Sequence, residues 1–363
     1  MLLTNNLFYF LSFFVFIFGL VIGSFLNVVI YRLPEGKSLL FPASSCPDCK
    51  TKIKFYDNIP IVSYFLLRGK CRSCGKKISL IYPVIEFLTA VLFYLLFIKI
   101  FYRAFFYFDI TPYNLSLFKN YLTYNFLLFI SYSFFIFILI PISFIDFFHR
   151  IIPDSLNIML IIAGFLFNIF LLHKSFLFPF IGFIAGGLFF YFIAVFYDLI
   201  RKKEGLGGGD IKLIAGIGAF LGIKGVIFTI FAGSFFGLLG FTLGSLYLYI
   251  QDRTKKISNQ SDNKEKLIQN DSNYNSGDHS DDISNTNSLA HNLNIISNND
   301  NSDSISNTNP KINLENLELN LNKADENFIS SKIPFGPFLS MAAIFYLFYG
   351  NYLINIYINF IKR

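Results

Sequence analysis

Long apolar stretches separated by shorter polar segments run through most of the chain. An α-helix needs about 20 apolar residues to cross the hydrocarbon core of a bilayer. Apolar runs predict about eight such helices, at residues 7–31, 81–101, 126–145, 155–173, 176–200, 211–225, 226–250 and 333–360. Residues 211–250 form one long apolar block that contains glycines, and we divide it into 211–225 and 226–250 only because of its length. Because alternating segments of the kind a membrane barrel needs are absent from the sequence, we expect an all-α, polytopic membrane helix bundle.

The first apolar segment has to be distinguished from a cleaved secretory signal. The residues before it, MLLTNN, carry no basic side chain, the apolar run is long, and no small-x-small cleavage site stands out. These features favour a retained spanning helix over a signal peptide.

Residues 254–330 have a different composition from the rest of the chain. They are rich in Asn, Ser and Asp and contain few aromatic side chains. Such a segment cannot bury enough apolar surface to compensate for the entropy lost on ordering. We expect a disordered cytoplasmic insert between the last two spans; a partner-binding tail is the alternative.

Composition and charge agree with a membrane protein. Hydrophobic residues make up 54% of the chain and charged residues 15%, whereas soluble domains carry about 25% charged residues. The net charge of +7 does not indicate nucleic-acid binding, because basic residues gather in short loops beside apolar segments. The positive-inside rule places residues 32–80, 146–154, 201–210 and the insert in the cytoplasm, with both termini outside.

All four cysteines lie in the loop 32–80, at Cys46, Cys49, Cys71 and Cys74. They form two C-x-x-C pairs separated by twenty-one residues, and each pair can supply two thiolates on one tight turn. Four thiolates suit a tetrahedral Zn²⁺ ion, and thiols stay reduced in the cytoplasm. A site closed by four protein ligands stabilises its loop and does no chemistry. Two disulfides or free thiols are the alternatives.

Two acidic residues lie at the membrane ends of apolar runs, on the side assigned to the cytoplasm. Asp146 follows FLLFISYSFFIFILIPISFI, and Asp210 follows the glycine-rich run 205–209. An ionised acid inside a membrane helix costs roughly 2.5–3.5 kcal/mol on insertion scales, so acids in such places are candidates for function. Two carboxyl groups about 3 Å apart would share one proton, which is the arrangement that acid–base peptide hydrolysis requires.

Each acid also has a purely structural interpretation, because an acidic residue stabilises the N-terminus of a helix. That interpretation suits Asp154, which we expect to cap the fourth span. The glycines before Asp210 favour a functional site, since they let a substrate backbone approach and are expected to interrupt the helix. Lys212 could stabilise an ionised acid or extend its ammonium group to the interface.

Several segments, in this order, resemble the prepilin peptidase family, also called type IV leader peptidases. The segments are GSFLNVVIYRLP at 23–34, CPDC at 46–49, YDNIPIVSYFLLRGKCRSCGKKIS at 56–79, YPVIEFLTA at 82–90, DFFHRIIPD at 146–154, GGGDIKLIAGIGAFLG at 207–222 and IPFGPFLSMAA at 333–343. The resemblance covers nearly the whole chain except residues 102–125 and the Asn-rich insert.

This resemblance implies a bacterial inner-membrane aspartic peptidase of the GxGD type, with Asp146 and Asp210 as its catalytic carboxylates. Such enzymes act within the lipid bilayer and remove the short basic leader of type IV prepilins and pseudopilins after a glycine, on the cytoplasmic face. Many also N-methylate the new terminal residue with S-adenosylmethionine, an activity associated with the N-terminal region, here 1–101. The peptidase domain would comprise 126–250 and 333–363. No residue is assigned to the methyl donor.

Further polar residues have two interpretations each. Gly23, Ser24 and Asn27 recur at helical spacing, which favours close helix packing over substrate contact. Glu86 lies near the start of the second span, where it can be a helix N-terminal acid or take part in methyl transfer.

Two other classes of protein share some of these features. Broken helices and buried acids also mark the ion pathways of transporters and channels, although the two acids lie near one face and not at the midplane. A non-catalytic assembly platform for a pilus or a secretion machine is the third possibility.

Overall fold

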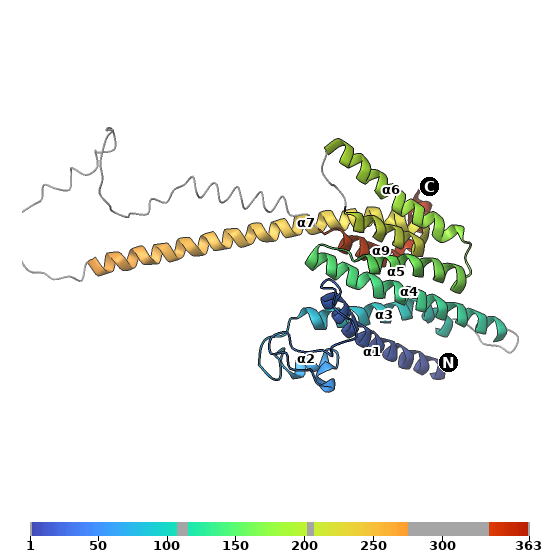
Figure 1. Ribbon diagram of the computed structural model, residues 1–363, viewed down its shortest axis with the longest axis horizontal. Coiled ribbons are helices and arrows are strands. Elements are labelled where there is room, and N and C mark those ends of the chain that lie inside the picture. Colours follow the sequence, from blue (N-terminus) through green and yellow to red (C-terminus); the bar gives the residue numbers. More distant parts are fainter. Residues whose placement is uncertain (1, 107–114, 202–206, 275–333, 362–363) are drawn as a thin grey trace, which may run out of the picture. The chain divides into compact units, whose positions relative to one another are not determined.

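The computed structural model describes residues 2–106, 115–201, 207–274 and 334–361 (Figure 1). The described residues are mostly helical and contain no strand, so the all-α expectation is confirmed. The elements are α1 (Leu2–Arg32), η1 (Phe55–Asn58), α2 (Val62–Leu66), α3 (Ile81–Phe106), α4 (Leu115–His149), α5 (Asp154–Leu166), η3 (Phe167–Leu171), α6 (Leu177–Arg201), α7 (Gly208–Tyr274) and α9 (Gly336–Ile361).

Six helices in this part of the chain are long and apolar enough to cross a membrane. They cover Asn6–Arg32, Ile81–Phe106, Ser116–His149, Asp154–Leu171, Leu177–Ile200 and Gly208–Gln251, and a shorter apolar helix covers Gly336–Gly350. The last of the six spans 44 residues and loses helical geometry at Gly222, where φ is 70° and ψ is −177°. This break lies close to the expected boundary between 211–225 and 226–250, and only glycine adopts such a backbone readily. The protein is an integral membrane helix bundle.

The chain divides into two compact units, Met1–Gly240 with Pro334–Arg363, and Phe241–Ile333. In the second unit α7 continues as a helix to Tyr274, so residues 254–274, which we expected to be disordered, are helical. Residues 245–274 contain neither glycine nor proline, and extending a formed helix costs far less than nucleating a new one. The remainder of the expected insert lies outside the described residues.

Helices α1 and α3 lie side by side and pack through small residues (Figure 1). A Cβ atom added at Gly19 or at Gly23 would lie 2.6 Å from a backbone Cα of α3, that of Ala90 or of Glu86. The Asn27 side chain donates a hydrogen bond to the Tyr82 carbonyl across the same interface, at 3.1 Å. The packing role expected for Gly23 and Asn27 is therefore confirmed.

Helix α4 is central to the first unit, where it contacts α1, α3, α5 and α9. Phe135, Leu139 and Ile142 are fully buried along it, and the ring of Phe135 packs against that of Phe220 on α7 at a centroid distance of 4.8 Å. Because α4 packs against four other helices, its position in the unit is fixed from several sides.

The break in α7 is supported by a buried amide. Asn168, in the π-helical segment η3, donates hydrogen bonds from Nδ2 to the carbonyls of Ala219 at 2.9 Å and Phe220 at 3.1 Å. These carbonyls lie just before Gly222, where the regular helical ladder is lost. The amide therefore compensates for hydrogen bonds that the break removes.

Candidate active site and metal centre

Asp146 lies in the last turn of α4 and is 5% exposed. Its Oδ2 accepts a hydrogen bond of 2.9 Å from the backbone N–H of Gly336, the first residue of α9. A Cβ atom at Gly336 would lie 2.6 Å from that same oxygen, so the close approach requires glycine. Sequence reasoning did not single out Gly336, although its position in the run P-F-G-P was a visible sign of an unusual backbone.

Asp210 lies in the first turn of α7 and its backbone N–H bonds to the Gly207 carbonyl at 3.1 Å. Its Oδ1 is buried and has no hydrogen-bond partner among the described residues. Helix α7 begins at Gly208, so the expectation that the glycine run interrupts a helix is wrong for its described part; the interruption lies at Gly222. Gly209 instead permits close packing, because a Cβ there would lie 3.0 Å from Ile152 Cβ.

The two acids, sixty-four positions apart in the sequence (210 − 146), come into one neighbourhood. Ile152 lies against Gly209 on one side and against Gly336 on the other, with its Cδ1 3.1 Å from the position of a Gly336 Cβ. The Asp146 carboxylate is close enough to interact electrostatically with that of Asp210. The structure thus brings together the ends of α4, α7 and α9 around two carboxyl groups.

Neighbouring polar residues fix the start of α7. The fully buried Asn157 of α5 donates a hydrogen bond from Nδ2 to the Gly209 carbonyl at 3.2 Å. Lys212 forms an ion pair of 2.7 Å with Asp154 and not with Asp146 or Asp210. Asp154 is not the N-cap we expected: Pro153 takes that position, and Asp154 lies in the first turn without a capping hydrogen bond. Its attraction to Lys212 across α5 and α7 explains its orientation.

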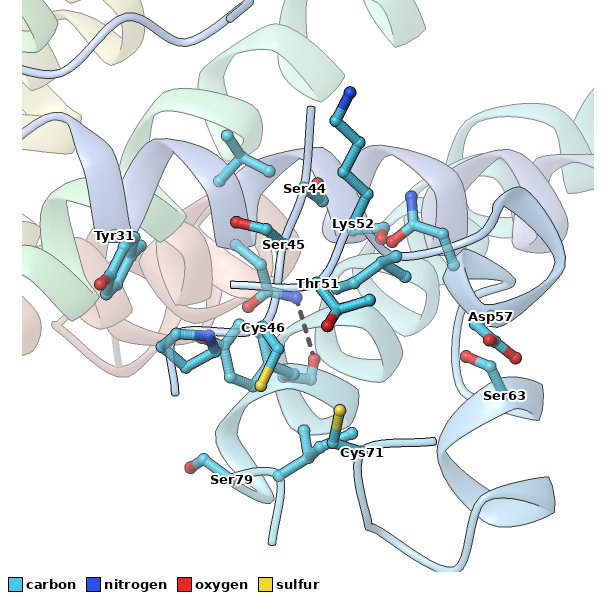
Figure 2. Close-up of a pocket in the computed structure, with 18 of the residues that line it drawn as sticks. Tyr31, Ser44, Ser45, Cys46, Thr51, Lys52, Asp57, Ser63, Cys71 and Ser79 are labelled. Atoms are coloured by element: carbon cyan, nitrogen blue, oxygen red, sulfur yellow. Dashed lines mark hydrogen bonds between the residues drawn. The ribbon is translucent and has the colours of Figure 1, made fainter. Parts of the chain in front are cut away.

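The four cysteines form a cluster that can hold a metal ion. All are free, and their sulfur atoms lie within 4.8 Å of one another. Figure 2 shows the sulfurs of Cys46 and Cys71 directed toward each other. Free thiols gathered at this separation fit a tetrahedral thiolate site, and no disulfide joins these residues in the described structure.

The two C-x-x-C turns have the same backbone geometry. Cys46 N–H bonds to the Thr51 carbonyl at 3.0 Å, and Cys71 N–H bonds to the Lys76 carbonyl at 2.8 Å. The fifth residue of each turn, Lys50 or Gly75, has a positive φ. Hydrogen bonds from Thr51 lower the pKa of the Cys49 thiol to about 6, whereas burial and the neighbouring cysteines raise the pKa of the Cys74 thiol to about 11.

Ion pairs join the two turns to the rest of the loop. Lys76 pairs with Asp48 at 2.5 Å, linking one turn to the other. Arg72 donates from Nε and Nη2 to both carboxylate oxygens of Asp57, at 2.6–3.1 Å. The Arg72 guanidinium holds the pKa of Asp57 below its usual range.

Glu86 connects α3 to the cysteine-containing loop and also lines a cavity. It is 8% exposed, and its Oε2 accepts a hydrogen bond of 2.7 Å from the backbone N–H of Ile61, in the cysteine-containing loop. Glu86 therefore joins α3 to that loop. It also lines a cavity of about 880 Å³ between the loop and the ends of α1 and α3 (Figure 2).

Fold and site together define a polytopic helical membrane protein with a pair of carboxyl groups, one buried and one partly buried, and a separate cysteine cluster. Two family models match the chain: Bacterial Peptidase A24 N-terminal domain over residues 17–100, and Type IV leader peptidase family over residues 133–242. The first match contains all four cysteines, and the second contains Asp146 and Asp210. Gly336 lies beyond both.

Curated relatives agree with these matches. The chain is 37% identical to the prepilin leader peptidase/N-methyltransferase of Neisseria gonorrhoeae over 61% of its own length and 78% of that protein. It is 35% identical to the protein of the same name from Klebsiella pneumoniae, over 58% of this chain and 84% of the relative. No solved structure matches the chain. The chain belongs to the type IV leader peptidase family.

Proposed function

We propose that this chain is a membrane aspartic endopeptidase that removes the short basic leader of type IV prepilins or pseudopilins after a glycine, and then N-methylates the new N-terminal residue. The observation that carries the proposal is the meeting of Asp146 and Asp210 at one end of the bundle. The names of the relatives supply the substrate class and the second activity. The transporter and assembly-platform alternatives are not favoured, because those relatives are named as enzymes.

The surroundings of the two acids suggest different roles for them. Asp146 already accepts a backbone N–H bond, and a hydrogen bond of this kind favours an ionised carboxylate. The Oδ1 atom of Asp210 is buried without a donor, which suits the partner that carries the shared proton. We assign Asp146 as the general base and Asp210 as the general acid.

Hydrolysis then follows the course expected of a carboxyl pair. Asp146 takes a proton from a water molecule, whose oxygen attacks the carbonyl carbon of the scissile glycine, while Asp210 gives its proton to the carbonyl oxygen. In the second step Asp146 gives the proton it took from water to the leaving nitrogen as the C–N bond breaks, and Asp210 takes a proton back from a hydroxyl of the tetrahedral intermediate. The products are the leader with a free carboxylate and the mature chain with a free amine.

The membrane position of the site suits a substrate that is partly charged and partly apolar. We assign the carboxyl pair to the cytoplasmic face of a bacterial inner membrane, and the basic residues in the loops on that side support this orientation. The basic leader would remain in water, while the apolar helix that follows it would lie among the spans. The substrate can therefore be cleaved between its leader and its helix while the leader stays in water and the helix stays in the membrane.

Different parts of the chain would carry out the two reactions. We assign residues 126–250 and 333–363 to proteolysis and 1–101 to methyl transfer. The four thiolates would hold a structural Zn²⁺, since their number and spacing fit a closed tetrahedral site. S-adenosylmethionine, when bound, supplies an electrophilic methyl group for the amine that proteolysis releases.

The test is cleavage of a prepilin peptide by the purified chain with S-adenosylmethionine present, followed by measurement of the product masses. Asp146→Asn and Asp210→Asn should each abolish cleavage while expression and membrane insertion stay normal. Glu35→Gln is the matched control, because Glu35 is an exposed acid of the loop 32–80 that is paired with Lys37. Wild-type cleavage by the Asp146 or the Asp210 variant would remove that residue from the mechanism.

A further inference from the structure

The cavity beside the cysteine loop is separate from the carboxyl pair. It is bounded by the end of α1, with Asn27 and Tyr31, by the start of α3, with Tyr82 and Glu86, and by the loop between them. None of the residues around Asp146 and Asp210 lines it. Its volume of about 880 Å³ is within the range of small-molecule sites, roughly 300–1,000 Å³.

Glu86 differs from the other acids that line this cavity. Asp48 and Asp57 are each paired with a cation, Lys76 and Arg72. Glu86 is almost completely buried, and in the part of the chain that the structure describes no ion pair involves it. A buried carboxylate without a cation is costly, so its position is suited to receive a positively charged ligand group.

The backbone around Glu86 is held in an unusual conformation. Ile61, whose N–H is directed at the Glu86 carboxylate, has φ of 61° and ψ of −51°. A β-branched residue is rarely found at positive φ, and such strain persists where the surrounding structure enforces it, often at ligand sites. Gly23 brings the α1 backbone against the main chain of Glu86, where a Cβ atom at Gly23 would lie 2.6 Å from the Glu86 Cα. The main chain of Glu86 and its carboxylate are thus each held by a separate contact.

Some basic residues of the cavity lining already have partners, whereas no ion pair among the described residues involves Lys50, Lys52, Lys54 or Lys77. Arg32 donates hydrogen bonds to the carbonyls of Ser38 at 3.0 Å and Pro42 at 2.7 Å, which holds the beginning of the loop. Arg72 and Lys76 are bound to carboxylates. The lining therefore offers ammonium groups without an ion pair as well as the buried acid, and a ligand that carries both an anionic and a cationic group would use both.

The remaining features fit one kind of molecule. Tyr31 and Tyr82 present partly exposed rings to the cavity, and such rings can stack on a flat base. Resting on the proposed methyl transfer, we infer that this cavity binds S-adenosylmethionine, with Glu86 facing its positively charged sulfonium and amino end and the two tyrosines contacting its adenine. The site uses residues from α1, α3 and the loop that the metal cluster stabilises.

The test is titration calorimetry of S-adenosylmethionine into the purified full-length chain in detergent. Glu86→Gln keeps the shape of the side chain and removes its charge, so the dissociation constant should rise by about tenfold or more. Tyr31→Leu should also weaken binding. Asp154→Asn is the matched control, because Asp154 is an exposed acid, paired with Lys212, that does not line the cavity, and it should bind as the wild type does.

Thermal unfolding and the metal content of each variant establish that it is folded. If Glu86→Gln does not fold, the affinity of Tyr31→Leu decides the test, because Tyr31 is 48% exposed and its replacement leaves the core intact. Wild-type affinity in the folded variants would overturn this site while leaving the proposed function intact. A wild-type chain that cleaves a prepilin peptide but binds no S-adenosylmethionine would also overturn it. A chain that binds the ligand through Glu86 but does not cleave would overturn the proposed peptidase and support the site.

Discussion

A single methyl group at position 336 should displace the carboxylate of Asp146. The Cβ atom of Gly336→Ala would lie 2.6 Å from Asp146 Oδ2 and 3.1 Å from Ile152 Cδ1, so the carboxylate would have to rotate away. That rotation removes the N–H···Oδ2 hydrogen bond of 2.9 Å. Hydrogen bonds to charged groups contribute about 1.5–3 kcal/mol, and each 1.4 kcal/mol is a factor of ten, so kcat/KM should fall roughly 10- to 150-fold.

The assay is the initial rate of prepilin-peptide cleavage in detergent, with products separated by mass. Gly237→Ala is the matched control, because the atoms nearest to its new Cβ, on Phe335 and Phe338, are 3.6 Å or more away, an ordinary contact distance. The control should cleave at the wild-type rate. If Gly336→Ala is folded and equally active, the backbone of α9 does not position Asp146, and the assignment of Asp146 as the base loses its support.

Three further predictions concern metal binding and stability. Cys46→Ser should lower bound zinc from about one ion per chain to nearly none by elemental analysis, whereas Ser45→Ala should retain it. Gly23→Val would force α1 from α3 and lower stability by about 1–3 kcal/mol in thermal unfolding, with Gly244→Ala, which meets no atom within 4 Å, unchanged. Asn168→Ala should cost about 1–3 kcal/mol by leaving two carbonyls without a donor, and an unchanged melting temperature would contradict that role.

Much of this protein is determined by patterns that are local in the sequence. Apolar runs of membrane-spanning length identify the helices, because backbone in lipid has to satisfy its hydrogen bonds within each segment. The C-x-x-C spacing identifies the thiol cluster, since two ligands on one turn are close whatever the rest of the fold does. Asp146 and Asp210 stand out because an acid at the edge of an apolar run is rare.

Sequence patterns predicted local structure less well in segments whose conformation depends on what they pack against or continue from. The polar composition of 254–274 indicated disorder, but a helix already formed in α7 continues through it at little cost. The glycines at 207–209 suggested a broken helix, whereas the packing of Gly209 against Ile152 keeps a helical start there, and the break occurs at Gly222. Neither outcome can be read from residue type, because each depends on what lies next to the segment.

Only the tertiary structure decided which groups meet. Gly336 and Asp146 are 190 positions apart, yet one donates its N–H to the other. The pairing of Glu86 with the Ile61 N–H and of Lys212 with Asp154 likewise joins separate elements. A hydrogen bond between distant residues depends on how whole helices pack, and the sequence around either partner carries no information about the other. The sequence by itself therefore determined the helices, the thiols and the acids, while packing decided how each acid is held.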